Sequence, residues 1–239
     1  MNTKEADRTV FANLVETVCT LYAYAPLLRA LGGHVVSTDE LTAIQALERI
    51  APTKPSRPGQ VKRQEFEYKR HGTLSLIMNF DVVTGQGLAP TLGPRRTEAD
   101  FTAHIAQTVA SDPAAVWVFV TDQLNTHQSE QLVRLVAALC TLPDELGEKG
   151  KAGVLQSMAS RAAFLSDPSH RIQFVYVPKH TSWLNQVEIW FSILIRRVIK
   201  RGNFSSLDDL RTRILAFIDY YNQTAKPFRW TYTGRPLVI

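Results

Sequence analysis

The segment Ala115–Thr121 constrains the fold more than any other part of the sequence. It consists of Ala-Val-Trp-Val-Phe-Val-Thr, an apolar run rich in β-branched and aromatic residues, and it is followed by Asp122. A strand without alternating polar residues buries both of its faces, which is typical of sheets that helices cover on both sides. The segment therefore predicts an interior strand of an α/β sheet, with an acidic residue at its carboxyl end.

Other segments supply the elements that such a sheet requires. Apolar or β-branched runs predict strands at His34–Thr38, Thr73–Phe80 and Arg171–Val177, and the glycines in Asp81–Leu88 predict a hairpin turn. Apolar residues at helical spacing predict five helices. These are Glu5–Tyr24, which ends before Pro26, a helix capped by Thr97, a helix around Leu132–Leu139, the helix Trp183–Lys200 and a helix capped by Ser206. This order predicts a mixed sheet with helices on both faces.

Two stretches do not fit the regular pattern. Pro52–Arg63 holds three prolines and four basic residues, which predicts a mobile basic loop. Pro143–Pro168 is polar and contains three glycines, and only Val154–Phe164 within it has a helical pattern. In the Trp183–Lys200 helix, Trp183, Trp190 and Phe191 are expected in the core.

Composition excludes several classes of protein. Of the 239 residues, 45% are hydrophobic and 21% charged, which excludes wholesale disorder. The longest purely apolar run, Ala114–Val120, is far shorter than the roughly 20 residues of a membrane span, and the polar N-terminus predicts no signal peptide. Cys19 and Cys140 have no paired spacing, which indicates a reducing compartment, and we expect a cytoplasmic protein without a zinc site.

The net charge of +5 is concentrated in two segments. Residues 52–71 contain six basic and two acidic side chains, and residues 196–239 contain nine basic and three acidic ones. Clustered positive charge indicates a polyanionic partner such as nucleic acid, although solvated surface charge remains the alternative. The candidate DNA contacts are Lys54, Arg57, Lys62, Arg63, Lys69, Arg70, Arg196, Arg197, Lys200 and Arg201.

Three carboxylates occupy positions where active sites often form. Asp39 and Asp122 are expected to end strands, and Glu188 lies on the polar side of a predicted helix. Ligands of open parallel sheets bind at the carboxyl ends of strands, so these groups could converge. Two carboxylates about 4 Å apart repel by roughly 4 kcal/mol at an effective dielectric of about 20. A hard divalent cation such as Mg²⁺ or Mn²⁺ would offset that repulsion.

Alternatives to this site remain open at this point. Acidic residues often follow strands simply because they form turns. Glu40 competes with Asp39, since adjacent strand residues face opposite sides and only one can point into a site. Asp81, beside the predicted hairpin turn, is a weaker rival.

At these residues the sequence resembles a known family, the mariner-superfamily transposases, and specifically their bacterial insertion-sequence relatives with a DDE catalytic domain. The resemblance runs from about Phe11 to Thr233. It is carried by the segments Ser37–Glu40, Ile44–Arg49, Tyr68–Thr73, Val120–Asp122 with Asn125–His127, Pro178–Phe191 and Asn222–Thr233. The run around Ser182–Phe191 is the most specific of these.

The resemblance implies a fold, a site and a reaction. The fold is an RNase H-like, retroviral-integrase-type five-stranded sheet, and Asp39, rather than Glu40, joins Asp122 and Glu188 in a triad that binds two Mg²⁺ or Mn²⁺ ions. The implied reaction is cleavage at transposon ends followed by strand transfer into target DNA, without a nucleotide cofactor or membrane. The implied partners are DNA, in the bacterial nucleoid, and a second copy in a homodimer. Asn185, His127 and His180 are candidate supporting residues that could touch water, phosphate or DNA.

The sequence also departs from the family pattern. The 66 residues from Asp122 to Glu188 form a longer gap than the family leads us to expect, which makes 143–168 a probable insertion. Gln123 follows the second aspartate where many relatives have asparagine. The helix-turn-helix modules with which relatives usually begin have no counterpart here, so we expect one product of a split reading frame, a truncated copy or a trimmed chain. We expect residues 1–30 to form a lead-in helix and residues 31–239 the catalytic domain.

Two other functions are compatible with these features. One is a catalytically silent DNA-binding or assembly fragment that regulates a full-length transposase. The other is a stand-alone RNase H-like nuclease, which would cleave DNA without joining strands.

Overall fold

The computed structural model describes residues 8–143 and 145–232, and its centre is a mixed five-stranded sheet with the order β3-β2-β1-β4-β5. β1 pairs in antiparallel fashion with β2 and in parallel with β4, and β4 pairs in parallel with β5. The strands are β1 (Gly33–Arg49), β2 (Tyr68–Asp81), β3 (Gly87–Gly93), β4 (Val116–Thr121) and β5 (Ile172–Tyr176). The predicted mixed sheet and the predicted hairpin between β2 and β3 are both confirmed.

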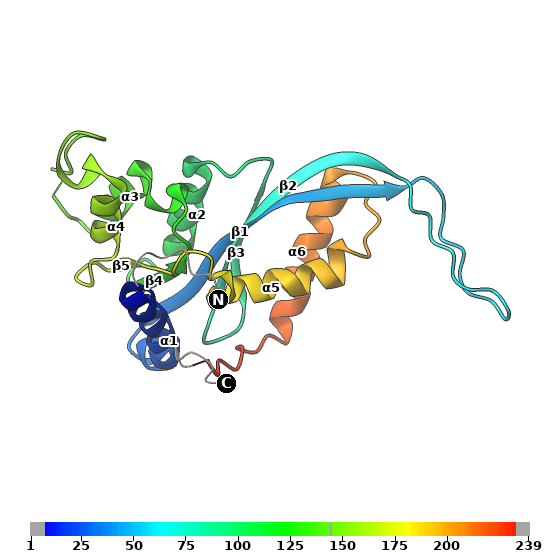
Figure 1. Cartoon of the computed structure of the whole chain (residues 1–239), viewed down its shortest axis with the longest axis horizontal. Helices are drawn as coiled ribbons and strands as arrows, with labels where there is room; N and C mark the ends of the chain where they lie inside the picture. The colour runs from blue at the N-terminus through cyan, green and yellow to red at the C-terminus, as the bar shows by residue number, and fades with distance from the viewer. Residues whose placement is uncertain (1–7, 144, 233–239) are drawn as a thin grey trace.

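Helices cover both faces of this sheet, as predicted (Figure 1). One face packs against α1 (Arg8–Ala30), α5 (Gln186–Leu194) and α6 (Leu207–Gln223). The other face packs against α2 (Glu98–Ala110), α3 (Glu130–Leu139) and α4 (Met158–Leu165). Each face therefore has its own hydrophobic cluster, and the strands separate the two clusters.

The interior position of β4 follows from its composition. Trp117 and Phe119 are buried in the cluster under α2 and α3, whereas Val118 and Val120 are buried in the cluster under α5. Phe119 stacks on Trp117 and on Phe174 of β5. Both faces of the strand are thus apolar, and Asp122 follows at its carboxyl end as predicted.

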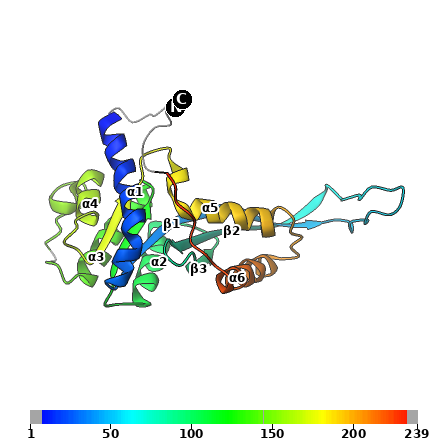
Figure 2. The same ribbon diagram turned by 90° about the horizontal axis from the view of Figure 1, so that it is seen from below.

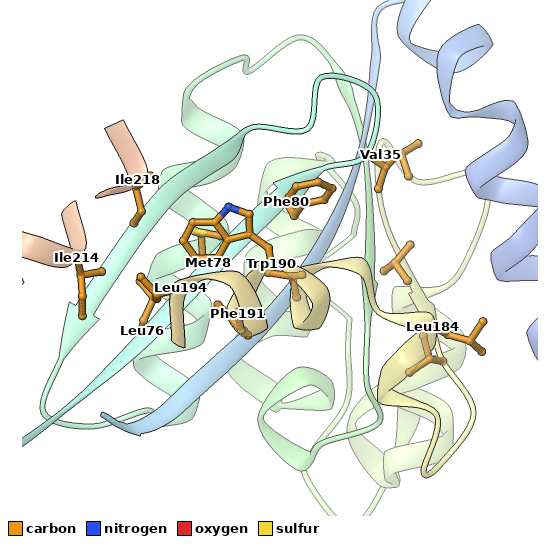
Figure 3. Packing of buried hydrophobic residues seen from close by; sticks show 14 of the residues in the cluster. Val35, Leu76, Met78, Phe80, Leu184, Trp190, Phe191, Leu194, Ile214 and Ile218 are labelled. Carbon is orange, nitrogen blue, oxygen red and sulfur yellow. The ribbon is translucent and has the colours of Figure 1, made fainter. Parts of the chain in front are cut away.

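The helix α5 is held on the sheet by large apolar side chains. Trp190, Phe191 and Leu194 of α5 are buried against the β2 residues Leu76, Met78 and Phe80 and the α6 residues Ile214 and Ile218 (Figure 3). Trp183 was also expected in this core, and that prediction is wrong. Its side chain is 41% exposed and packs edge-on against Tyr232, because a short 3₁₀ turn (Ser182–Leu184) precedes the helix.

The strand β1 is much longer than the predicted His34–Thr38. Its parallel pairing with β4 covers only Gly33 to Ser37, but its pairing with β2 continues to Arg49 through two register shifts. Asp39 therefore does not end the strand; it lies just beyond the point where the parallel partner stops. Residues 50–67, which we call the arm, join β1 to β2 and project from the body of the molecule (Figures 1 and 2).

The predicted basic loop at Pro52–Arg63 forms the outer part of this arm. Isolated antiparallel bridges join Lys54 to Arg63 and Arg57 to Gln60, so the two sides of the arm run together as a narrow ribbon. The prolines prevent a continuous ladder, because each removes a backbone donor.

Helix ends differ from the predictions in two places. α1 runs through Pro26 to Ala30, and its predicted start at Glu5 lies outside the described residues. Ala25 is buried and Leu28 packs against the same cluster, so tertiary contacts outweigh the cost of one missing hydrogen bond. The predicted Trp183–Lys200 helix is interrupted, since α5 ends at Leu194 and a π-helical turn (Ile195–Ile199) follows.

The predicted caps of α2 and α6 are present. Thr97 forms a capping box with Asp100, and the Ser206 side chain accepts a hydrogen bond from the Asp209 amide. Residues 153–156 form a 3₁₀ turn before α4, and the buried Arg161 of α4 donates to the carbonyls of Gln128 and Leu155. Leu155 and Leu165 belong to the hydrophobic cluster on this face, so the helical part of the predicted insertion packs onto the sheet.

Among the described residues, α1 is the one helix that is long and apolar enough, by length and composition, to cross a membrane. The core helices of soluble proteins pass the same test. Val15, Val18, Cys19, Tyr22 and Ala25 of α1 are buried in the cluster that α5 and α6 share.

Candidate active site

Asp39 lies where β1 leaves its parallel partner, and its carboxylate is held on both oxygens. The residue is 7% exposed. Oδ1 accepts a hydrogen bond from the Glu40 amide at 2.8 Å, and Oδ2 accepts one from Asn185 Nδ2 at 2.9 Å. Asp39 therefore faces the side of the sheet that α5 covers.

Asn185 joins the strand to the helix that carries Glu188. It occupies the N-cap position of α5, is fully buried, and also donates to the Thr38 carbonyl at 3.1 Å. Its Oδ1 accepts a hydrogen bond from Ser37, and the Ser37 hydroxyl in turn accepts one from the Val187 amide. Asn185 is thus a buried residue that fixes Asp39 against α5, rather than a surface residue open to water or phosphate.

Asp122 follows β4 and is bound on one oxygen only. Its Oδ1 accepts from the Leu124 amide at 3.0 Å and lies 2.7 Å from His127 Nδ1. The Asp122 side chain is 43% exposed. Burial opposes its ionisation, but the hydrogen bond and positive charge of His127 prevail and lower the pKa of Asp122.

Glu188 lies half-buried in the first turn of α5, and it lines a pocket of about 640 Å³ together with Asp39 and Asp122. Three elements that are distant in sequence therefore bring the three predicted acids to one place. Burial and the nearby charge of Asp122 raise the pKa of Glu188. Burial, and then the charges of Asp122 and Glu188, raise the pKa of Asp39 to about 7.

The donor set suits a hard divalent cation. Three carboxylates that line one pocket repel each other, and this repulsion adds to burial, the larger cause, in raising the pKa values of Asp39 and Glu188. A cation would relieve that repulsion. In the described part of the chain, no three His, Cys, Asp or Glu side chains are already grouped closely enough to hold a metal ion. Binding would therefore require the carboxylates to draw together.

The structure separates Asp39 from its sequence rivals. Glu40 also lines the pocket, but its carboxylate lies on the opposite side of β1 from that of Asp39. There its Oε1 lies 3.2 Å from His127 Nε2 and its Oε2 lies 3.5 Å from Arg96 Nη1. Asp81 lies at the other end of the sheet, and its Oδ1 accepts from the amides of Val83 and Thr84 in the hairpin turn. Asp81 is therefore a turn residue.

The two predicted supporting histidines have different surroundings. His127 has no exposed side-chain surface, so it is not available to touch DNA, and its ring lies 4.1 Å from that of Phe101. His180 is exposed, has a φ of 63°, and lines the pocket beside Lys179. Gln123, which stands where many relatives have asparagine, donates to the Val177 carbonyl and joins the ends of β4 and β5.

A second, more apolar groove of about 720 Å³ lies at the base of the arm, and Lys200 is the one predicted basic residue among those that line it. The arm, the outer half of β1 and the π-helical turn line this groove, which includes Arg49 and Lys200. Thr42 lines both this groove and the acidic pocket, so the two hollows adjoin. The candidate contacts are exposed on the arm, at the start of β2 and after α5: Lys54, Arg57, Lys62, Arg63, Lys69, Arg70, Arg196, Arg197, Lys200 and Arg201.

Comparison with known families gives the site its context. The profile of the DDE superfamily endonuclease family matches residues 34–211, a span that includes all three acids. This chain belongs to that family. No match to the chain was found among curated protein sequences.

Solved structures of Mos1 transposase share the fold of this DDE domain. The catalytic domain of Mos1 mariner transposase superposes with a TM-score of 0.53 at 9% identity, covering 92% of this chain and 85% of that one. The Mos1 mariner paired end complex with Mn superposes with a TM-score of 0.55 at 10% identity, covering 92% of this chain. This chain spans 58% of the Mos1 chain in that complex. The predicted RNase H-like fold is thereby confirmed.

Several residues of this DDE pocket escaped the sequence analysis. Arg96 and Lys179 line the pocket, and Ser37 fixes both Asn185 and the start of α5. Arg96 directly precedes the Thr97 cap, and Lys179 lies within the family segment Pro178–Phe191. Ser37 begins the family segment Ser37–Glu40, but no role was predicted for it, because a small polar residue inside a strand is usually a minor element of packing.

Proposed function

We propose that this chain is the catalytic domain of a transposase of the bacterial insertion-sequence branch, and that residues 31–239 form that domain. It cleaves DNA at transposon ends and joins the freed 3′-hydroxyl to target DNA. The observation that carries this proposal is that Asp39, Asp122 and Glu188 line one pocket in a chain of the DDE family. The Mos1 relatives, which include complexes with Mn and with Mg, support the use of a divalent metal.

In this proposal each residue of the pocket has a defined part. Asp39, Asp122 and Glu188 hold two Mg²⁺ or Mn²⁺ ions, and Asn185 fixes the Asp39 carboxylate toward α5. The bound cations supply activation of the attacking oxygen and stabilisation of the leaving oxygen at phosphorus. Lys179 and Arg96, which line the same pocket, bind the phosphates that flank the cleaved bond.

The DNA path in this proposal runs from the acidic pocket into the adjoining groove and toward the arm. Thr42 borders both hollows, and Lys200 lines the groove. The arm and the π-helical turn each contribute to the groove wall, and both carry further exposed basic residues. Such contacts neutralise backbone phosphates without reading base sequence.

The test is Mn²⁺-dependent nicking of supercoiled plasmid by the wild-type chain and by Glu188→Gln. Loss of several kcal/mol of metal-supplied stabilisation predicts at least a ~10³-fold slower rate for Glu188→Gln. Glu130→Gln, which removes a carboxylate from a surface pair with Arg134, is the matched control and should nick normally. Nicking that survives Glu188→Gln would refute the assignment.

A second assay separates the alternatives. A radiolabelled DNA end with a free 3′-hydroxyl is incubated with the chain, Mn²⁺ and plasmid, and joined products are scored. Joined products are expected. Nicking without joining would instead indicate a stand-alone nuclease, and DNA binding without either reaction would indicate a regulatory fragment.

A further inference from the structure

Four ionisable side chains form a chain of contacts behind Asp122, and its two inner members, Glu40 and His127, are buried. Arg96 pairs with Glu40, Glu40 pairs with His127 Nε2, and His127 Nδ1 pairs with Asp122, over distances of 3.5, 3.2 and 2.7 Å. The Glu40 side chain is 1% exposed and that of His127 is fully buried. Buried charges are costly unless they are paired, so this chain of contacts fixes each of its members.

His127 has little freedom to move within this chain. Its ring is packed against Phe101, and its Nδ1 also lies 2.9 Å from the Thr121 hydroxyl and 3.3 Å from the Asp122 carbonyl. Both ring nitrogens therefore have carboxylate partners on opposite sides. The position of Glu40 on the far side of β1 decides how the imidazole is oriented.

The contacts of Asp122 are unequally divided between its two oxygens. The Leu124 amide and His127 both bind Oδ1. Within residues 8–143 and 145–232, no hydrogen bond or ion pair involves Oδ2. His127 and the Leu124 amide thus engage one oxygen of a carboxylate that lines the pocket, and they leave the other oxygen available.

We propose that His127, oriented by Glu40, is a positioning residue that presents Oδ2 of Asp122 to the metal. This inference rests on the proposed function, because it assumes that Asp122 is a metal ligand. It gives Glu40, the neighbour of Asp39, its own role on the opposite side of the strand. Groups of this kind, which orient a ligand from behind, typically change metal affinity by about 10–100-fold when they are removed.

Two substitutions of His127 test its contact with Glu40 and its contact with Asp122 separately. His127→Gln places an amide nitrogen near the position of Nε2, so it keeps a donor for Glu40 and loses the donor for Asp122. His127→Asn places the nitrogen near Nδ1 and does the reverse. His104→Asn is the matched control, because His104 is a buried histidine of α2 whose Nδ1 bonds Thr91 and whose contacts include no carboxylate.

The readout is Mn²⁺ binding to the folded chain, measured from the free Mn²⁺ signal in electron paramagnetic resonance, with Tm as the check on folding. His127→Gln should bind Mn²⁺ about 10–100-fold more weakly than wild type. His127→Asn should lose clearly less Mn²⁺ affinity than His127→Gln does. His104→Asn should bind as wild type. In nicking assays, the Mn²⁺ concentration for half-maximal rate should rise for His127→Gln, while the rate recovers at high Mn²⁺.

Equal Mn²⁺ affinity in wild type and His127→Gln would overturn the inference and leave the proposed function intact. Equal losses of Mn²⁺ affinity in His127→Gln and His104→Asn would also overturn the inference, since they would reflect a general loosening of the core. If His127→Gln does not fold, Glu40→Gln tests the same contacts: weaker Mn²⁺ binding supports the inference and unchanged binding overturns it. A wild-type chain that binds no Mn²⁺ would overturn the proposed function as well.

Discussion

The two halves of β1 have opposite surroundings although they belong to one strand. From Gly33 to Ser37 the strand pairs with β4, and from Val36 onward it also pairs with β2. Both faces of this half are covered, and Val35 and Val36 are almost fully buried. Beyond Leu41 it pairs with β2 alone, through two register shifts, and it leads into the arm, where Val61 and Phe66 are 81% and 82% exposed. The strand thus changes from a core element into one side of a projecting ribbon.

Asp39 lies between these halves, and its place explains why the difference matters. Metal chemistry needs carboxylates held in fixed positions, which the buried half next to β4 provides. Contact with a long polyanion needs reach and exposed charge, which the arm provides. At this boundary the acidic pocket, with its fixed carboxylates, adjoins the groove at the base of the arm, and Thr42 lines both.

The largest expected difference between the two regions is in stability. Phe119→Ala removes a fully buried ring from β4 and should lower the free energy of unfolding by about 3–5 kcal/mol. Phe66→Ala removes an equal ring from the arm and should change it by less than about 0.5 kcal/mol. Urea unfolding of both variants measures the difference. A large loss in Phe66→Ala would show that the arm is packed in solution.

The next largest effect is the pH dependence of the free energy of unfolding that Asp39, at the boundary between the two halves of β1, produces. The pKa of Asp39 is about 7 in the folded chain, against 3.8 ordinarily, so the folded chain holds this proton more tightly than the unfolded chain does. The stability that the protonated carboxyl contributes is therefore fully present below about pH 4 and is lost as pH rises through about 7. Relative to wild type, Asp39→Asn should therefore gain stability across this window, by at most about 4 kcal/mol. Unfolding is measured with a chelator present, and a flat difference between pH 4 and 7.5 would refute the raised pKa.

A smaller effect is expected for the residue that joins β1 to α5. Asn185→Ala frees the Asp39 carboxylate and should slow Mn²⁺-dependent nicking by about 10–100-fold. Asn222→Ala is the control, since Asn222 makes two hydrogen bonds with the Gly87 backbone, away from the pocket. Equal losses in the two variants would mean that Asn185 serves stability alone.

The smallest effects are expected when a pair of basic residues is removed from the arm or from the π-helical turn, and they concern the salt dependence of DNA binding. The double variants Lys62→Ala/Arg63→Ala and Arg196→Ala/Arg197→Ala should each flatten the slope of log affinity against log salt by up to about 1.8. Lys149→Ala/Lys151→Ala, exposed lysines near α4, should leave the slope unchanged. An unchanged slope for either test pair would remove that pair from the DNA contacts.

Local sequence patterns were sufficient for much of this fold. The apolar run of β4 has no polar face, so it can lie only inside a covered sheet, and Asp122 follows it necessarily. The caps Thr97 and Ser206 act within one helical turn, and both occur as predicted. Two predictions that failed depend on distant partners. Pro26 lies inside α1 because the helix packs on the sheet, and Trp183 packs on Tyr232 near the end of the described chain instead of in the core.

The candidate acids could likewise be named from the sequence, but their arrangement could not be derived from it. The resemblance selected Asp39 over Glu40, and alternation along a strand required the two to face opposite sides. Only the packing of α5 on one face and of His127 on the other decided which partner each carboxylate meets. Hydrogen bonds between residues more than 80 positions apart depend on the completed sheet, so no local pattern contains them.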